Sequence, residues 1–297
     1  MDRGVPIGTR AMIEIPEEFA SSLVRREGEP ARQWLSRVPE LFAKYLEVWD
    51  LRPDGAPMHG AVGLVLPVRG ADESPAALKL SLPSPETEHE WLTLSTWDGR
   101  GAVRLLDHGA GDSALLLERL DADRSLEDIE LDEAVRIAGE LLRRQAVPAP
   151  PEIRTLAGLA ERWAEEFAAE TRIPRRLLDA GIEVCTQLGP VSRRLIVNQD
   201  LHFENVLAGE REPWLVIDPK AVAGDPEFGL TPLLWNQFDG PGVGRRLAAL
   251  VDAAGLDLDL ARAWTLVSAL ENWTWALDTE GEQEMADMVE VIAHTVC

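Results

Sequence analysis

Two acidic side chains and one amide follow two short apolar runs in the second half of the chain. The run 194–197 ends just before Asp200, and Asn205 lies five residues after that aspartate. The second run begins at Trp214 and ends at Asp218. Groups at the ends of strands are well positioned and still reach solvent. The pattern therefore predicts one site that contains Asp200, Asn205 and Asp218.

Phosphoryl transfer is the chemistry that this set of oxygen-bearing groups can support. Mg²⁺ prefers hard oxygen ligands and is usually held by one or two protein groups together with phosphate oxygens. Asn205 and Asp218 can supply those ligands, and Asp200 can accept or orient the proton of an incoming hydroxyl. Each residue alone could belong to a turn, so the joint spacing is what favours a shared site.

A lysine inside a predicted strand adds a group suited to phosphate. Lys79 stands between two leucines, whose side chains point to the opposite face of a strand. It fits a lysine that positions phosphates, with a glutamate on the following helix as its partner. We choose Glu90, and Glu88 and Glu86 are the alternatives. His202 has no second His or Cys at ligand spacing, which favours a structural histidine.

The elements that must position these residues fall into two parts. Helical apolar spacing marks 16–24 and 30–49, and Pro39 predicts either two short helices or one kinked helix. The remaining predicted elements are strands at 61–69, 76–82, 103–108 and 114–120, a short helix at 85–97, and helices at 125–145, 153–170, 174–188 and within 243–296. A boundary near 118–121 divides a mixed N-terminal part, 1–118, from a helical part, 119–297.

Composition restricts the class of partner. The 297 residues carry 29 Lys and Arg against 52 Asp and Glu, a formal charge of −23. Such a chain repels nucleic acid and anionic lipid, so neither is expected as a partner. A cationic small molecule is a better expectation, and solubility is the alternative explanation of the charge.

Cysteine usage and hydropathy bear on location. The two cysteines, Cys185 and Cys297, are far apart without metal spacing and are expected to be free thiols in a reducing cytoplasm. The first residues include acids and lack an apolar run, so no secretory leader is expected. No stretch is long and apolar enough to predict a membrane span.

Three motifs resemble the aminoglycoside phosphotransferases, and more narrowly the streptomycin 6-kinase and hydroxyurea phosphotransferase family of antibiotic-resistance kinases. They are Asn198-Gln-Asp-Leu-His-Phe-Glu-Asn-Val-Leu, Trp214-Leu-Val-Ile-Asp-Pro-Lys and Gly224-Asp-Pro. In the first half, Leu78-Lys-Leu, Trp97-Asp-Gly-Arg-Gly and Leu115-Leu-Leu-Glu-Arg-Leu are also similar to that family. The resemblance extends from about 50 to 240 and is specific as a set.

The resemblance implies an α+β, protein-kinase-like fold with a small antiparallel-sheet lobe and a larger helical lobe. It implies that 1–118 is the nucleotide-binding lobe and that 119–297 is the catalytic and acceptor-binding lobe. It implies that Asp200 is the catalytic base and that Asn205 and Asp218 hold Mg²⁺. It also implies an ATP site: Lys79 would contact the phosphates, Glu90 would pair with it, and Glu118 to Leu120 would meet the adenine. Gly60, in a poor glycine-rich stretch, is the candidate for a backbone donor to phosphate.

Three departures from the family pattern stand out. Asn198 and Gln199 replace the His and Gly that precede the catalytic aspartate in relatives, and Gly229 replaces an Asp that could brace the catalytic loop. The first of these positions is mainly an organiser, so activity is expected to survive. Lys220 follows Asp218 closely and is either a phosphate contact or a surface lysine.

The expected activity is transfer of the γ-phosphate of ATP to a hydroxyl of a small, cationic acceptor such as the aminoglycoside streptomycin, which gives antibiotic resistance. Glu271, Trp235 and Asn236 are candidates for the acceptor pocket, and a solvated helix face is the alternative for Glu271 and its acidic neighbours. A metabolic sugar, amino-sugar or hydroxyurea kinase is an alternative activity. A nucleotide-binding pseudokinase without turnover is an alternative of a different class.

Overall fold

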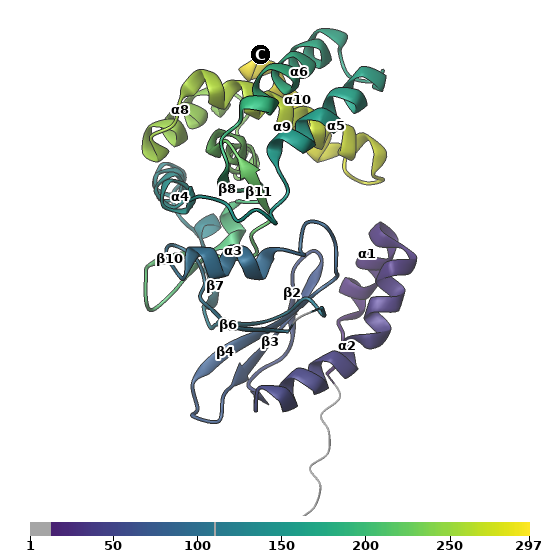
Figure 1. Ribbon diagram of the computed structural model, residues 1–297, viewed down its shortest axis with the longest axis vertical. Coiled ribbons are helices and arrows are strands. Elements are labelled where there is room, and N and C mark those ends of the chain that lie inside the picture. Colours follow the sequence, from purple (N-terminus) through teal and green to yellow (C-terminus); the bar gives the residue numbers. More distant parts are fainter. Residues whose placement is uncertain (1–12, 110) are drawn as a thin grey trace, which may run out of the picture. The chain divides into compact units, whose positions relative to one another are not determined.

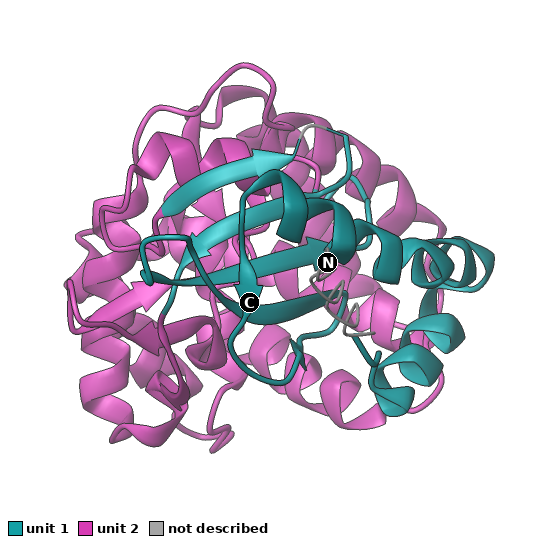
Figure 2. Cartoon of the chain, turned by 90° about the horizontal axis from the view of Figure 1, so that it is seen from below, with its two compact units in different colours: residues 1–87, 105–119 teal, residues 88–104, 120–297 magenta. Residues whose placement is uncertain are grey.

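The computed structural model describes residues 13–109 and 111–297, and the chain forms two compact units (Figures 1 and 2). The first unit comprises residues 1–87 and 105–119, and the second comprises 88–104 and 120–297. The chain passes from the first unit to the second after Thr87, returns after Arg104, and passes to the second unit again after Arg119. Residues 88–104, which the sequence analysis places in the N-terminal part, belong to the second unit.

An antiparallel sheet forms the centre of the first unit. Its strand order is β1-β3-β4-β6-β5, and β2 pairs with β3. The strands are β1 Arg52–Pro53, β2 Met58–His59, β3 Gly63–Arg69, β4 Pro75–Ser81, β5 Leu105–Gly109 and β6 Ala114–Glu118. Because β4 lies between β3 and β6, both of its edges are paired, and its residues from Ala76 onward are buried.

Two helices complete the first unit: α1 (Glu17–Glu27) and α2 (Glu29–Val48). Trp34, Val38 and Phe42 of α2 are buried in one cluster with the leucines of β3 and β4. A fully buried side chain of this size stabilises the fold by roughly 1.5–3 kcal/mol. α2 continues through Pro39, so one helix forms and not two short ones.

The second unit is mainly helical, with two small antiparallel sheets (Figure 1). Its helices are α3 Glu90–Trp97, α4 Leu131–Gln145, α5 Leu156–Ala169, α6 Arg175–Leu188, α7 Pro232–Trp235, α8 Val243–Ala254, α9 Leu258–Asp278 and α10 Gln283–Val296. Its 3-10 turns are η1 Leu126–Asp128, η2 Gly189–Val191, η3 Phe203–Asn205 and η4 Pro226–Leu230. α9 packs against α10, α6 and η4 and is apolar on most sides, as a central helix must be.

The small sheets bring the predicted site segments together. β8 (Leu195–Asn198) pairs with β11 (Ala221–Gly224), with Asn198 opposite Ala221. β9 (Val206–Ala208) lies between β7 (Asp121–Ser125) and β10 (Trp214–Val216). Consequently the turn after β8 and the turn after β10 are neighbours, although about 20 residues separate them in the sequence.

Two predicted helices begin later than expected. The helix predicted at 85–97 begins at Glu90. The helix predicted from 125 begins at Leu131, because Ser125 and Asp128 form a capping box around η1. The capping box therefore caps the 3-10 turn η1 and not the long helix α4 that follows it.

Both cysteines are free thiols, Cys185 buried and Cys297 exposed. Among residues 13–109 and 111–297, no helix is long and apolar enough to cross a membrane. Residues 1–12, to which the expectation about a leader applies, lie outside the described part of the chain.

Candidate active site

Asp200 lies in the turn that follows β8. The strand itself is buried, and the chain reaches partial exposure at Asp200, whose side chain is 25% exposed. The Asp200 carbonyl accepts hydrogen bonds from the backbone N–H of His202 and from the side-chain amide of Asn205, each at 3.0 Å. These bonds fix the path of the turn, so Asp200 is held in a defined place.

Asn205 and Asp218 are linked through the main chain. The Ile217 N–H donates to the Asn205 carbonyl at 2.9 Å, which places the residue before Asp218 against η3. Because the Asn205 Nδ2 donates to the Asp200 carbonyl, its Oδ1 is the atom that can face a metal ion. Asp218 has a φ of +49°, a conformation that Asp and Asn tolerate better than bulky residues. The structure thus brings all three predicted residues into one small region.

The donor set fits Mg²⁺ shared with phosphate better than a metal held by protein alone. Asn205 offers an amide oxygen and Asp218 a carboxylate, the hard ligands that Mg²⁺ takes alongside phosphate oxygens. Within the described residues there is no cluster of three or more His, Cys, Asp or Glu that could hold a metal ion. His202 belongs to no such cluster within that part of the chain.

Lys220 lies against the predicted base. Its Nζ is 3.0 Å from Asp200 Oδ2, and the Lys220 side chain is 22% exposed. The Lys220 carbonyl accepts from the Gln199 N–H at 3.0 Å, so main-chain and side-chain contacts both join the two turns. The sequence suggests either a phosphate contact or a surface lysine for Lys220. Its pairing with Asp200 is an additional contact that only the structure shows.

Asn198 connects the same two turns through its side chain. Its Oδ1 accepts from the backbone N–H of Asp200 at 3.0 Å and of Lys220 at 3.1 Å. The bond to residue i+2 is an Asx turn, which the sequence alone suggests. The bond to Lys220 requires the pairing of β8 with β11, which the sequence does not reveal.

Gly229 packs closely against the end of β8. A Cβ at this position would lie 2.9 Å from the Asn198 carbonyl oxygen and 3.0 Å from Val197 Cγ1. Distances this short are not tolerated without displacement of the backbone. The family's Asp could not occupy this place with the backbone as it stands, so Gly229 is a packing requirement here.

The first unit holds three of the candidates for nucleotide binding. Lys79 is in β4, opposite Val65 of β3 and Leu115 of β6, and is 6% exposed. Gly60 lies in the turn between β2 and β3, and its N–H donates to the Gly63 carbonyl at 3.0 Å, so that N–H is already used. Glu118 ends β6, opposite Ala76.

The second unit holds the other two candidates. Glu90 is the first residue of α3 and is 3% exposed. Leu120 directly follows the passage from the first unit. A pairing of Glu90 with Lys79 would join residues of the two units, and it stays a prediction.

The candidates for acceptor binding lie in two places within the second unit. Trp235 ends α7 and is partly buried. Asn236 follows it, and its Oδ1 accepts from the Phe203 N–H at 2.8 Å, so this residue contacts η3, the turn that ends at Asn205. Glu271 is in α9, and its carboxylate accepts from the side-chain amide of Asn272 at 2.9 Å.

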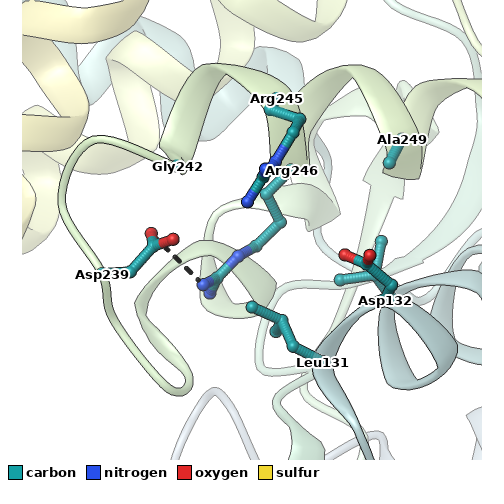
Figure 3. A pocket seen from close by; sticks show the side chains of 8 residues that line it. Leu131, Asp132, Asp239, Gly242, Arg245, Arg246 and Ala249 are labelled. Atoms are coloured by element: carbon teal, nitrogen blue, oxygen red, sulfur yellow. Dashed lines mark ion pairs between the residues drawn. The ribbon is translucent and has the colours of Figure 1, made fainter.

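Arg246 supports the segment that carries Asn236. Its guanidinium donates to the carbonyls of Leu234, Asn236 and Gln237 and lies 3.6 Å from Asp239 (Figure 3). Burial lowers the pKa of Arg246 from its usual value. The cavity beside it measures about 20 Å³, room for about one water molecule, so it is too small for an acceptor.

An acid that the sequence analysis did not single out lies beside η3, the turn that ends at Asn205. Glu127 is in η1, which packs against η3. Burial raises the pKa of the Glu127 carboxyl, and the charge of Glu204 raises it further. No motif marks Glu127 in the sequence, because its position depends on the packing of two 3-10 turns.

Comparison with known proteins identifies the family. The model of the aminoglycoside/hydroxyurea antibiotic resistance kinases matches residues 48–280. A streptomycin 6-kinase of Streptomyces glaucescens is 40% identical over 92% of this chain and 94% of its own length. A hydroxyurea phosphotransferase of Kitasatospora aureofaciens is 41% identical over 96% of this chain and 86% of its own.

Solved structures confirm the protein-kinase-like fold of sheet and helical lobes. A choline/ethanolamine kinase family protein of Mesorhizobium loti aligns with a TM-score of 0.60 and 15% identity, covering 87% of this chain and 94% of its own. An ethanolamine kinase of Plasmodium vivax aligns with a TM-score of 0.57 and 12% identity, covering 96% and 94%. Taken with the family match, these findings show that the chain belongs to the aminoglycoside/hydroxyurea antibiotic resistance kinases.

Proposed function

We propose that this kinase transfers the γ-phosphate of ATP, with Mg²⁺, to a hydroxyl of a small cationic acceptor such as streptomycin, in the cytoplasm. The observation that carries the proposal is the connected set of turns that holds Asp200, Asn205 and Asp218. The Asp200 side chain is partly exposed, and Asn205 and Asp218 lie in turns that hydrogen bonds connect to its own. Phosphoryl transfer needs a group that orients the attacking hydroxyl and oxygen ligands for Mg²⁺, and these three residues can supply both.

In the proposed reaction the acceptor oxygen forms a bond to the γ-phosphorus as the bond to the β–γ bridging oxygen of ATP breaks. Asp200 Oδ1 accepts the hydroxyl proton, since Oδ2 faces Lys220. Mg²⁺ bound at Asn205 and Asp218 would neutralise charge on the phosphates. The protein contributes mainly position and electrostatic stabilisation, so the fixed turns account for much of its effect.

Lys79 and Glu90 support a nucleotide site through their burial. An ammonium and a carboxylate that are 6% and 3% exposed are stable in charged form only with partners of opposite charge. The family resemblance supports the proposal that Lys79 reaches the ATP phosphates and that Glu90 is its partner. Glu118 to Leu120 would offer backbone groups to the adenine, and Gly60 would allow phosphate to approach through its small size.

A cationic acceptor is supported by charge. The chain carries a net −23, and Glu127 and Glu204 lie near each other beside the catalytic turn. Carboxylates bind ammonium and guanidinium groups through charge-assisted hydrogen bonds. Trp235, Asn236 and Glu271 remain the proposed acceptor contacts, with Asn236 also supporting the turn.

Hydroxyurea is the second candidate acceptor, since a hydroxyurea phosphotransferase is 41% identical to this chain. A coupled ADP-release assay with streptomycin, other aminoglycosides and hydroxyurea, followed by ³¹P NMR of the product, tests both. The proposal expects release with streptomycin that Asp200→Ala abolishes while ATP still binds. Release with hydroxyurea alone would reassign the acceptor, and binding of ATP without release from any acceptor would favour a pseudokinase.

A further inference from the structure

We propose that Asn198 is a positioning residue for phosphoryl transfer, in the place where relatives have His. Its Oδ1 ties the turn that carries Asp200 to the turn that carries Asp218 and Lys220. This inference rests on the proposed function, because it concerns the residues that the transfer uses. Asn198 does not face the reacting atoms in this account and acts through Asp200 and Lys220.

The orientation of the Asn198 amide follows from its neighbours. Two backbone N–H donors, of Asp200 and Lys220, converge on one atom at 3.0 and 3.1 Å, and only the amide oxygen can accept from both. Asn198 is 6% exposed, and its Nδ2 is buried without a hydrogen-bond partner among the described residues. A buried donor without a partner costs stability. We infer that the two hydrogen bonds accepted by Oδ1 offset this cost.

The bond to Lys220 adds a constraint that the main chain alone does not supply. Lys220 Nζ lies 3.0 Å from Asp200 Oδ2, so Asn198 holds the backbone of both partners in that ion pair. Gly229 lies against the Asn198 carbonyl, where a Cβ would come within 2.9 Å. The absence of a side chain at Gly229 thus allows Asn198 to occupy this position.

The test compares two substitutions of nearly equal size. Asn198→Leu removes the acceptor, whereas Asn198→Asp keeps an oxygen for both N–H groups. We expect Asn198→Leu to lower kcat roughly 10- to 100-fold, as displacement of a catalytic group does, with KM for ATP little changed. We expect the kcat of Asn198→Asp to stay much closer to that of the parent. Gln145→Leu is the matched control, because it removes another buried amide, one that donates to the Gly101 carbonyl at 3.0 Å, and should leave kcat unchanged.

A measurement on the unmodified protein keeps the inference testable if Asn198→Leu does not fold. The backbone N–H groups of Asp200 and Lys220 should exchange with solvent at least about tenfold more slowly than free amides. Unprotected N–H groups would overturn the inference, as would a kcat for Asn198→Leu within twofold of the parent or equal losses in both variants. No turnover by the parent with any acceptor would instead contradict the proposed function.

Discussion

Replacement of Lys220 by Met should slow catalysis without preventing ATP binding. Lys220 Nζ lies 3.0 Å from Asp200 Oδ2. Two unit charges at that distance attract by about 1.4 kcal/mol in water and about 5.5 kcal/mol at an effective dielectric constant of 20. The side chains are 22% and 25% exposed, which favours the lower part of that range.

A loss of about 1.4–2.8 kcal/mol of transition-state stabilisation corresponds to roughly a 10- to 100-fold decrease in kcat. The decrease is expected because Met neither holds the Asp200 carboxylate in one orientation nor balances its charge. Lys220→Arg keeps the cation and should lose less. Steady-state kinetics of ADP release with streptomycin, at saturating ATP, measures the effect.

Lys44, one of the three lysines of the chain, offers a matched control. Lys44 also forms an ion pair, with Asp112 at 2.5 Å, but it lies on the first unit with a half-exposed side chain. Lys44→Met should leave kcat within about twofold, as surface ion pairs contribute little. The reasoning is refuted if Lys220→Met keeps full kcat, or if Lys44→Met loses as much.

Three further predictions concern packing, pH and thiol chemistry. Gly229→Ala should cost about 1–3 kcal/mol of unfolding free energy in urea, because its Cβ would lie 2.9 Å from the Asn198 carbonyl oxygen; unchanged stability would show that the backbone yields freely there. Hydrogen bonds from Arg172 lower the pKa of Glu170 from 4.5 to about 2, so this carboxylate contributes stability above about pH 4.5 that is lost as the pH falls toward 2. Glu170→Gln should therefore lower Tm at pH 7 and converge with the parent near pH 2, and a difference independent of pH would contradict this. Burial raises the pKa of Cys185 to about 12, so in the native protein a thiol reagent at pH 8 should modify only the exposed cysteine at position 297; rapid modification of both would contradict the buried placement.

The candidate site was predictable because its signals are local in the sequence. Asp200 and Asp218 follow apolar runs closely, and Asn205 lies five residues after Asp200. Hydrogen bonds of 2.9–3.0 Å link Asn205 to Asp200 and to Ile217, the residue before Asp218. The strand assignment of Lys79 was equally local, since it depends on the leucines at either side. The predicted protein-kinase-like fold is confirmed by the structural comparisons.

What the sequence did not predict depends on contacts between distant segments. Asn198 reaches Lys220, 22 residues away, only because β8 and β11 pair in a particular register. The sequence predicts that Gly229 removes a brace from the loop, whereas in the structure a Cβ at this position would lie 2.9 Å from the Asn198 carbonyl oxygen. The capping box at Ser125 does not mark the start of the long helix. It caps η1, and the helix begins at Leu131.

The central claim is that Asn205 and Asp218 hold one divalent ion together with nucleotide phosphate beside Asp200. Mn²⁺ binding followed by electron paramagnetic resonance, with and without ADP, tests it most directly. The account predicts Mn²⁺ affinity that increases with ADP, that falls at least about tenfold in Asp218→Asn, and that falls less in Asn205→Ala. Asp218→Asn keeps an oxygen but removes the negative charge from the ligand set, and even changes to groups that only support a ligand cost about 10- to 100-fold in metal affinity. Equal Mn²⁺ affinity in the parent and Asp218→Asn, in the presence of ADP, would contradict the claim.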